Sequence, residues 1–346
     1  MPRSRSPRQR VVDSVVNKRI AAPTAAAIAR AAHLLRDGLL VAFPTETVYG
    51  LGADAANPDA VRGIFAAKGR PADHPVIVHL GDAMQLAHWA RAVPDAAMNL
   101  AAAFWPGPLT LILPRASHVA DIVTGGQDSV GLRVPSHPVA RELIAAFGGG
   151  IAAPSANRFG RISPTTAQHV DDDLGNSTAM ILDGGSCPIG IESTIVAFSD
   201  DRPVLLRPGG VGVSALSRVL GRPLDEPDAS APRASGTLAA HYAPRTPASL
   251  LAPDMLRAEI TQLDERDEIV AVLARTLARP ADFTGVWLPA SLDAQQYAHD
   301  LYANLRTLDA ANADVILIER VPDDDAWLAV RDRLSRAARG VDDDRD

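Results

Sequence analysis

The sequence predicts an α/β protein made of two domains. At 346 residues the chain exceeds the usual size of one domain. Short apolar runs alternate along it with segments whose apolar residues recur at helical spacing. A proline-rich stretch without such periodicity, residues 221–247, separates two regions of this kind. We therefore expect a disordered basic tail at 1–20, a larger domain at 21–220, a linker at 221–247 and a smaller α/β domain at 248–340.

The larger domain is predicted to open with a helix followed by a buried strand. Residues 23–36 place Ile28, Ala31 and Leu35 on one helical face, and Gly38 follows as a stop signal. The next apolar run, LLVAF, has the composition of a buried strand. The polar segment TETVYGLG follows at the carboxyl end of that strand, where open α/β sheets bind their ligands.

A second helix is expected between Asn57, which is a good N-cap, and Gly69, which ends helices. Lys68 therefore lies at the end of this helix. Further buried strands are predicted at the runs PVIVHL, PLTLILP, SVGLRVP, GIAAPS, AMILDGG, STIVAF and PVLLRP. Several of these runs end in polar residues, glycine or proline, which is typical of a sheet whose functional groups gather along one edge.

The smaller domain shows the same alternation. The runs EIVAVLA and DVILIE are predicted to be buried strands, and Tyr297, Leu301 and Leu305 form one stripe of a helix. The last helix has acidic residues first and arginines last, as the helix dipole prefers. The linker before this domain contains an aromatic pair in the segment HYAP, which suggests that the linker docks against a domain.

Charge and cysteine content exclude several classes of protein. The net charge is −7, and the first twenty residues carry +5, which leaves −7 − 5 = −12 for the remainder. A domain that is so acidic does not bind nucleic acid by bulk electrostatics. The single cysteine, Cys187, excludes an intramolecular disulfide and a Cys-rich zinc site. A single cysteine also fits a reducing compartment, so we expect a cytoplasmic protein. Because no apolar run reaches about 18 residues, we expect no membrane span.

Candidate functional residues cluster in two short segments. The chain has no Walker A, dinucleotide-binding or G-x-S-x-G motif. It does have Lys68, one of only two lysines, with Arg70 in KGRP, and Ser155 with Asn157 in APSAN. These side chains together are suitable donors for a polyphosphate. Each fragment alone also fits a solvated charge or a turn, which is the more common situation.

Other polar residues lie at the margins of predicted strands. Arg133 falls inside the apolar run VGLRVP, where a buried guanidinium needs an anion. That anion is either an internal carboxylate or a substrate carboxylate. Thr47, His79, Ser193 and Arg207 lie at similar positions, where such residues more often form turns or pack in the core than bind a substrate.

Seven motifs occur in an order that resembles one known family. They are PTETVYGLG, KGRP with HP.IVH, FWPGPLTLIL, VGLRVP, APSAN.FG..SPTT, DGG.C..G.ESTI and LLRPGG. In this order they resemble the YrdC-like L-threonylcarbamoyladenylate synthases over about residues 23–220. The linker and the region beyond it resemble the long, two-domain form. The resemblance implies a twisted mixed sheet with helices in the larger domain and a Rossmann-like α/β fold in the smaller one.

The resemblance also implies an activity. Members of the family are nucleotidyltransferases that form threonylcarbamoyl-AMP and pyrophosphate from L-threonine, bicarbonate or CO2, and ATP with bound Mg2+. Their product passes to a tRNA threonylcarbamoyl transferase, which modifies adenosine 37 of tRNAs that read ANN codons. Such chemistry needs positioning and charge neutralisation more than a protein acid or base.

Residue roles follow from the same resemblance, and no protein-built metal site is expected. The residues implied for catalysis are Lys68, Arg70, Ser155 and Asn157. Those implied for L-threonine are Thr47, His79, Arg133, Ala153 and Ser193. Those implied for ATP are Lys68, Arg70, His74, Ser129, Ser155, Asn157, Ser163, Arg207 and Tyr242. His74 stands where relatives commonly carry Asn, and Tyr242 would fold over the site and shield the intermediate from water.

Two alternative functions remain open at this point. One is an RNA-binding module without turnover, in which the basic segment PRSRSPRQR makes a weak RNA contact. The acidity of the remaining chain argues against it. The other is carbamoyl transfer in hydrogenase maturation, whose large proteins contain a similar domain together with Cys-rich zinc motifs. The single cysteine argues against that alternative.

Overall fold

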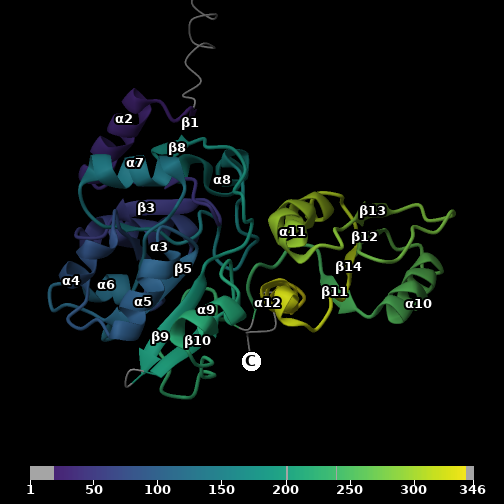
Figure 1. Ribbon diagram of the computed structural model, residues 1–346. Helices are drawn as coiled ribbons and strands as arrows, with labels where there is room; N and C mark the ends of the chain where they lie inside the picture. Colours follow the sequence, from purple (N-terminus) through teal and green to yellow (C-terminus); the bar gives the residue numbers. More distant parts are fainter. Residues whose placement is uncertain (1–18, 200–201, 239, 340–346) are drawn as a thin grey trace, which may run out of the picture.

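The computed structural model of the chain describes residues 19–199, 202–238 and 240–339. The expected tail therefore lies outside the described residues, except for its last two positions. The described part contains one ten-stranded and one four-stranded sheet, which belong to two units that lie side by side (Figure 1). No helix in the described part is both long and apolar enough to cross a lipid bilayer.

The ten-stranded sheet is mixed, as the resemblance implies. Its strand order is β1-β8-β2-β3-β7-β4-β6-β5-β9-β10, and it contains parallel pairs such as β4 with β6 as well as antiparallel pairs such as β3 with β7. The strands are β1 (Ile20–Ala21), β2 (Val41–Phe43), β3 (Gly50–Asp54), β4 (Ile77–His79), β5 (Leu109–Pro114), β6 (Ser129–Arg133), β7 (Ile151–Ala152), β8 (Met180–Leu182), β9 (Thr194–Ser199) and β10 (Arg202–Arg207).

Local sequence signals explain where the helices of this unit begin and end. In α3 (Pro58–Lys68) the Asn57 side chain accepts hydrogen bonds from two backbone N–H groups of the first turn, and Gly69 ends the helix at φ 63°. The prediction for this helix is therefore confirmed. The other helices of the unit are α2 (Ala25–Arg36), α4 (Leu86–Trp89), α5 (Asp95–Phe104), α6 (Asp121–Thr124), α7 (Pro138–Phe147), α8 (Ala167–Leu174) and α9 (Val213–Leu220).

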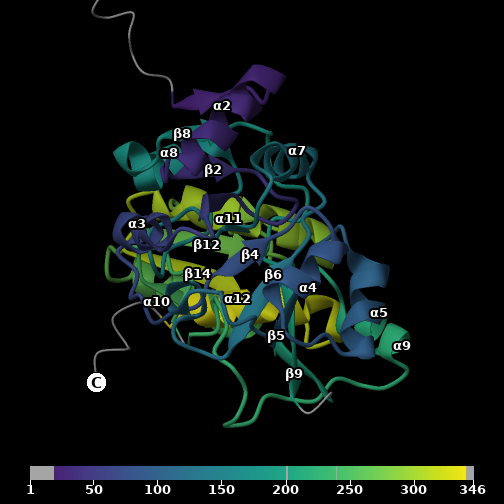
Figure 2. The ribbon, with the colours of Figure 1, turned by 90° about the vertical axis from the view of Figure 1, so that its left-hand side faces the viewer.

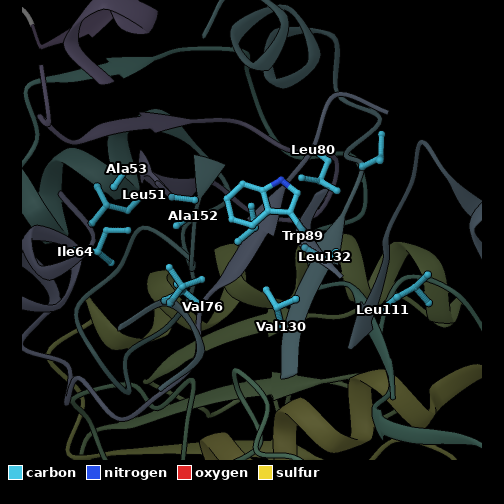
Figure 3. Close-up of a cluster of buried hydrophobic side chains, with 14 of the residues drawn as sticks. Leu51, Ala53, Ile64, Val76, Leu80, Trp89, Leu111, Val130, Leu132 and Ala152 are labelled. Atoms are coloured by element: carbon cyan, nitrogen blue, oxygen red, sulfur yellow. The ribbon is translucent and has the colours of Figure 1, made fainter. Parts of the chain in front are cut away.

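Apolar side chains are buried on both faces of the sheet. Successive residues of β2 point to opposite faces, so that Val41 and Phe43 pack beneath α2 and α7, whereas Ala42 packs on the other side. On that other side the larger cluster joins strand residues to Ile64 of α3 and Trp89 of α4, as Figure 3 shows. Burial on both faces explains why the strands read as continuous apolar runs in the sequence.

The second unit is a parallel sheet with the order β11-β14-β12-β13, which matches the predicted Rossmann-like class. Helices α11 and α12 face the larger unit and α10 lies on the far side (Figure 1); in the view of Figure 2 the smaller unit lies behind the larger one. The elements are β11 (Ala248–Leu251), α10 (Pro253–Asp264), β12 (Val270–Ala274), β13 (Val286–Pro289), α11 (Ala294–Asp309), β14 (Val315–Glu319) and α12 (Leu328–Ala337).

The two units share a buried interface. Val48, Ile162 and Ile191 of the larger unit belong to the same apolar cluster as residues of α11 and α12. Gly190 lies so close to α11 that a Cβ atom there would be 2.3 Å from the carbonyl oxygen of His299. The smaller unit is therefore packed against the rim of the large sheet rather than tethered at a distance.

The expected linker runs between α9 and β11. Its described residues form no helix or strand, but two isolated bridges tie it to the larger unit, from Val204 to Asp225 and from Arg161 to Ala243. Between these bridges the chain crosses the edge of the large sheet where several of its strands end.

Candidate functional site

A pocket with about 460 Å³ of empty space lies at one edge of the large sheet. Its walls come from the loop after β2, from the carboxyl ends of β4, β6 and β10, and from the chain that follows β7. The linker supplies the remaining wall through Ser235, Gly236, His241 and Tyr242, which we call the lid. The pocket thus lies where the sequence predicts that functional groups gather.

Lys68 at the end of α3 is held against this pocket. Its Nζ donates to the carbonyl oxygens of Ser155 at 2.6 Å and Asn157 at 2.5 Å, and Ser155 itself lines the pocket. Lys68 is only 3 % exposed, and burial together with the nearby Arg70 guanidinium lowers the pKa of its ammonium well below the usual value. Lys68 itself does not line the pocket; it lies behind Ser155, and its two hydrogen bonds go to backbone carbonyl groups.

Two further arginines at this edge are buried without a carboxylate. Arg70 donates through Nη2 to the carbonyl oxygen of Pro75 at 2.8 Å, and burial lowers its pKa to about 10. Arg207 donates to the carbonyl oxygens of Ser193 at 2.8 Å and Ser235 at 2.7 Å, and burial also lowers its pKa. In residues 19–199, 202–238 and 240–339, no carboxylate forms a salt bridge with Lys68, Arg70 or Arg207.

The charges of these three cations all act on one side chain of the lid. His241 of the lid is buried, which lowers its pKa to about 3, and the charges of Arg70, Lys68 and Arg207 contribute to that shift. Buried cations whose only partners are carbonyl and hydroxyl dipoles favour the arrival of an anion. The arrangement can therefore bind a polyanion at the lid side of the pocket.

Arg133 differs from these three because it has a carboxylate partner. Its Nη2 is 2.6 Å from Oε1 of Glu46, and both side chains are buried. Burial would raise the pKa of the Glu46 carboxyl, but the Arg133 guanidinium lowers it below its usual value. Of the two anions considered for Arg133, the structure contains the internal carboxylate. The guanidinium nevertheless lines the pocket.

All five residues predicted to contact L-threonine line this one pocket: Thr47, His79, Arg133, Ala153 and Ser193. The Thr47 hydroxyl is 2.8 Å from that of Thr45, and the Ser193 hydroxyl is 2.8 Å from that of Thr110. Burial and then the charge of Arg133 lower the pKa of His79 to about 3, so its imidazole is neutral at pH 7.

The residues predicted to contact ATP are distributed more widely. Ser155, Arg207 and Tyr242 line the same pocket. Ser129 lines a neighbouring cavity with about 290 Å³ of empty space, which shares Ile77 and Ser235 with the first. The two cavities are neighbours, and the other residues predicted to contact ATP, namely Lys68, Arg70, His74, Asn157 and Ser163, line neither of them.

Three others of this set contact protein groups. The Asn157 Nδ2 donates to the carbonyl oxygens of Arg158 and Arg161, both at 2.7 Å, while its Oδ1 is buried without a partner. Ser163 donates to Oε1 of Glu192 at 2.7 Å. His74 packs edge-on against the ring of Phe159, with the ring centres 5.3 Å apart, and lines neither cavity.

Sequence reasoning missed Glu46 and Glu192. Both are buried; Glu192 lines the pocket, whereas Glu46 does not line it but pairs with Arg133, which does. The signal for Glu46 was present, because it lies beside Thr47 in a loop directly after a buried strand. Glu192 precedes Ser193 in the motif ESTI, but its charged partner, Arg333, comes from the smaller unit and could not be read from the sequence.

The pocket does not offer the side chains of a metal site. Within the described ranges, no group of three or more His, Cys, Asp and Glu residues could hold a metal ion. The carboxylates of Glu192, which lines the pocket, and of Glu46 are each engaged by an arginine, Arg333 and Arg133 respectively.

Comparisons with known proteins agree with this architecture. A family model described as "Telomere recombination", of the Sua5, YciO and YrdC proteins, matches residues 33–209. A second model, described as "Threonylcarbamoyl-AMP synthase, C-terminal domain", matches residues 211–339. A threonylcarbamoyl-AMP synthase from Bacillus subtilis is 41% identical over 324 residues, covering 90% of this chain and 93% of that protein. One from Pyrococcus abyssi is 40% identical over 327 residues, covering 89% and 93%.

A solved structure has the same arrangement of both units. The crystal structure of P. abyssi Sua5 complexed with L-threonine matches with a TM-score of 0.83 at 40% sequence identity. The match covers 90% of this chain and 94% of that one, so it includes the larger unit, the linker and the smaller unit. Given the two family models and these relatives, the chain belongs to the threonylcarbamoyl-AMP synthase family, in its two-domain form.

Proposed function

We propose that this protein is an L-threonylcarbamoyladenylate synthase. It forms threonylcarbamoyl-AMP and pyrophosphate from L-threonine, bicarbonate or CO2, and ATP. The observation that carries the proposal is the set of three buried cations, Lys68, Arg70 and Arg207, that contact only dipoles beside a pocket lined by Arg133. Such a site suits a triphosphate next to a small amino acid. Its relatives over nine-tenths of the chain support the same activity.

The chemistry asks the protein mainly for positioning and charge neutralisation. The amine of threonine adds to CO2 and loses a proton, which gives a carbamate. A carbamate oxygen then attacks the α-phosphorus of ATP, and the bond to pyrophosphate breaks. Lys68 and Arg70 neutralise the phosphates and the departing pyrophosphate, and Ser155 and Asn157 form the adjoining loop. Each contribution is electrostatic, and it is strong because these groups are shielded from water.

The two cavities suggest where each substrate lies. L-Threonine occupies the first pocket, with its carboxylate at Arg133 and its remaining polar groups within reach of Thr47, His79 and Ser193. The nucleotide extends toward the second cavity, where Ser129 and apolar side chains suit a ribose and a base. The lid then covers both substrates and keeps water from the carbamate and the mixed anhydride.

Mg2+ enters with the nucleotide. Because Glu46 and Glu192 are each engaged by an arginine, the protein offers no carboxylate for the ion there, and Mg2+ would come with the nucleotide and help to neutralise its phosphates. We further propose that the adenylate passes to a tRNA threonylcarbamoyl transferase in the cytoplasm for modification of adenosine 37.

A direct assay tests this function. The protein is incubated with ATP, Mg2+, labelled threonine and bicarbonate, and threonylcarbamoyl-AMP is sought by mass spectrometry together with released pyrophosphate. We expect both products, and neither when threonine or bicarbonate is omitted. If folded protein forms no mixed anhydride, the proposal is wrong. Salt-sensitive RNA binding without turnover would instead support the RNA-binding alternative.

A further inference from the structure

The smaller unit reaches the pocket through one buried side chain, Arg333 of α12. This arginine is 0 % exposed, and its guanidinium makes four contacts. Nε donates to Oε2 of Glu192 at 2.7 Å, Nη1 to Oδ2 of Asp332 at 2.5 Å, and Nη2 to the carbonyl oxygen of Pro208 at 3.0 Å. Its Cζ also lies 5.1 Å from the centre of the Tyr242 ring.

Three of these four partners belong to the pocket wall or adjoin it. Glu192 lines the pocket and precedes Ser193, Pro208 follows Arg207, and Tyr242 belongs to the lid. One side chain of the smaller unit thus contacts three separate segments that surround the predicted substrates. Asp332 precedes Arg333 on α12, and its carboxylate accepts a hydrogen bond from Nη1 of the Arg333 guanidinium.

Tyr302 of α11 contacts two of the same residues, Glu192 and Tyr242. Its hydroxyl donates to Oε2 of Glu192 at 2.8 Å, and its ring stacks on that of Tyr242 with the centres 5.7 Å apart. Tyr242 is fully buried and has a φ of 63°, which a non-glycine residue adopts only when its surroundings hold it. The closed position of the lid therefore depends on contacts from α11 and α12.

We propose that Arg333 is a positioning residue for the adenylation site, through which the smaller unit holds the lid closed and aligns Glu192–Ser193 with Arg207. This inference rests on the proposed function and gives the smaller unit a task in it. Substrates enter when Tyr242 leaves the Arg333 guanidinium, and the intermediates are protected when it returns.

Four variants test the proposal. Arg333→Met keeps the length of the side chain and removes its charge and donors. Arg333→Lys keeps a charge for Glu192 but cannot contact Glu192 and Pro208 with one planar group. The double variant Glu192→Gln with Arg333→Met removes both buried charges, so that neither is left unpaired. Arg331→Met is the control, because Arg331 lies on the same helix and, among the described residues, its hydrogen bonds and ion pair are to Pro322, Asp323 and Asp324 of the smaller unit.

Each variant is assayed for the KM of ATP and for the ratio of threonylcarbamoyl-AMP recovered to pyrophosphate released. Hydrogen exchange of linker residues 221–247 is followed with and without ATP and threonine. For Arg333→Met and for the double variant we expect a KM raised by about tenfold to a hundredfold. We also expect a lower product ratio and faster exchange in the linker. Arg333→Lys should lie between these and the parent, and Arg331→Met should match the parent.

The outcomes separate this inference from the proposed function. If the folded double variant retains the parental KM, product ratio and linker exchange, Arg333 has only a structural role and the inference is wrong. If the parent itself forms no threonylcarbamoyl-AMP, the proposed function fails. In that case linker exchange alone still decides whether Arg333 holds the lid, because it requires no turnover.

Discussion

Two groups of buried charge lie on either side of Glu192, and they are built differently. On the pocket side, Lys68, Arg70 and Arg207 contact backbone carbonyls and no carboxylate within the described residues. On the side of the smaller unit, Arg333 meets Glu192 at 2.7 Å and Asp332 at 2.5 Å. The fold pairs Arg333 with carboxylates of the protein, and we propose that the anion for Lys68, Arg70 and Arg207 comes from a ligand.

Arg133 shows how the two arrangements combine. Glu46 occupies one edge of its guanidinium and the carbonyl oxygen of Gly107, at 3.3 Å, accepts from Nε. The side chain is thereby oriented while part of it still faces the pocket. A paired arginine of this kind can bind a second carboxylate without carrying an uncompensated charge when the pocket is empty.

The largest effect expected from the comparison is on turnover. Lys68→Met should lower the rate of pyrophosphate release by about 100- to 1000-fold, because it removes a preorganised charge at the phosphates. Its stability should stay the same or rise, since the ammonium it removes is buried without a carboxylate. Urea unfolding at pH 7 measures the stability of the variant against the parent. A clear loss of stability would mean that Lys68 is a structural cation and would break the comparison.

Substitution of Glu192, on the side of the smaller unit, is expected to destabilise the fold. Glu192→Gln should lower the free energy of unfolding by about 1.5–3 kcal/mol, because the Arg333 guanidinium keeps Asp332 but loses one of its two carboxylate partners. The double variant Glu192→Gln with Arg333→Met should recover most of that loss. Urea unfolding of the parent, of Glu192→Gln and of the double variant measures both the loss of stability and its recovery. Equal stability of Glu192→Gln and Arg331→Met would contradict this expectation.

Stabilisation by a bound anion should also distinguish the two groups of buried charge. Pyrophosphate at 100 times its Kd should stabilise the folded parent by about 2.7 kcal/mol. Lys68→Met should lose most of this stabilisation, whereas the double variant at Glu192 and Arg333 should keep part of it, because its three pocket cations remain. Thermal unfolding at constant ionic strength, with sodium chloride as the control, gives the shifts. If pyrophosphate stabilised Lys68→Met as much as it stabilises the parent, the anion would bind at a site that does not include Lys68.

The smallest effect is on pH dependence. The pKa values of His79 and His241 are lowered to about 3, so both stay neutral in the folded state at pH 6, while in the unfolded chain they titrate near 6.5. The unfolded state then binds more protons, and stability falls as the pH drops below about 6.5. Between pH 7 and pH 6 the loss should be about 1 kcal/mol, and His79→Gln should reduce it.

Glu192, which pairs with Arg333, should titrate at a lower pH than the two histidines. Burial would raise the pKa of Glu192, but Arg333 and Arg207 lower it to about 2. A carboxyl with a depressed pKa contributes its full stability above its unfolded value, near 4.3, and loses it as the pH falls toward 2. Glu192→Gln should therefore leave the slope between pH 7 and pH 6 unchanged. If Glu192→Gln changed the slope of stability against pH between pH 7 and pH 6, the titration of Glu192 would be coupled to that of the two histidines.

Much of the fold could be predicted because its signals are local. Asn57, Pro58 and Gly69 bound α3 as expected, and the apolar runs fall on the strands of a sheet buried on both faces. The residues expected to contact threonine also converge, because their motifs follow strands that end at one edge of that sheet. Helix capping and strand composition act within a few residues, and a sequence displays them directly.

The partners of the buried charges could not be predicted in this way. Arg133 and Glu46 are 87 residues apart in the chain, and Arg333 and Glu192 are 141 apart. Nothing local distinguishes Arg133 and Arg333, which meet carboxylates, from Arg70 and Arg207, which do not. That choice depends on which strand ends become neighbours and on how α12 packs against the large sheet.

The sequence by itself determined the helices, the strands, the linker and the supply of cationic and hydroxylic side chains, because these depend on short-range propensity and periodicity. Only the tertiary structure decided which cations receive an anion from the protein and which keep a place for one from a substrate. Electrostatic pairing acts over a few ångströms in space, and the order of strands and the docking of the second unit set those distances.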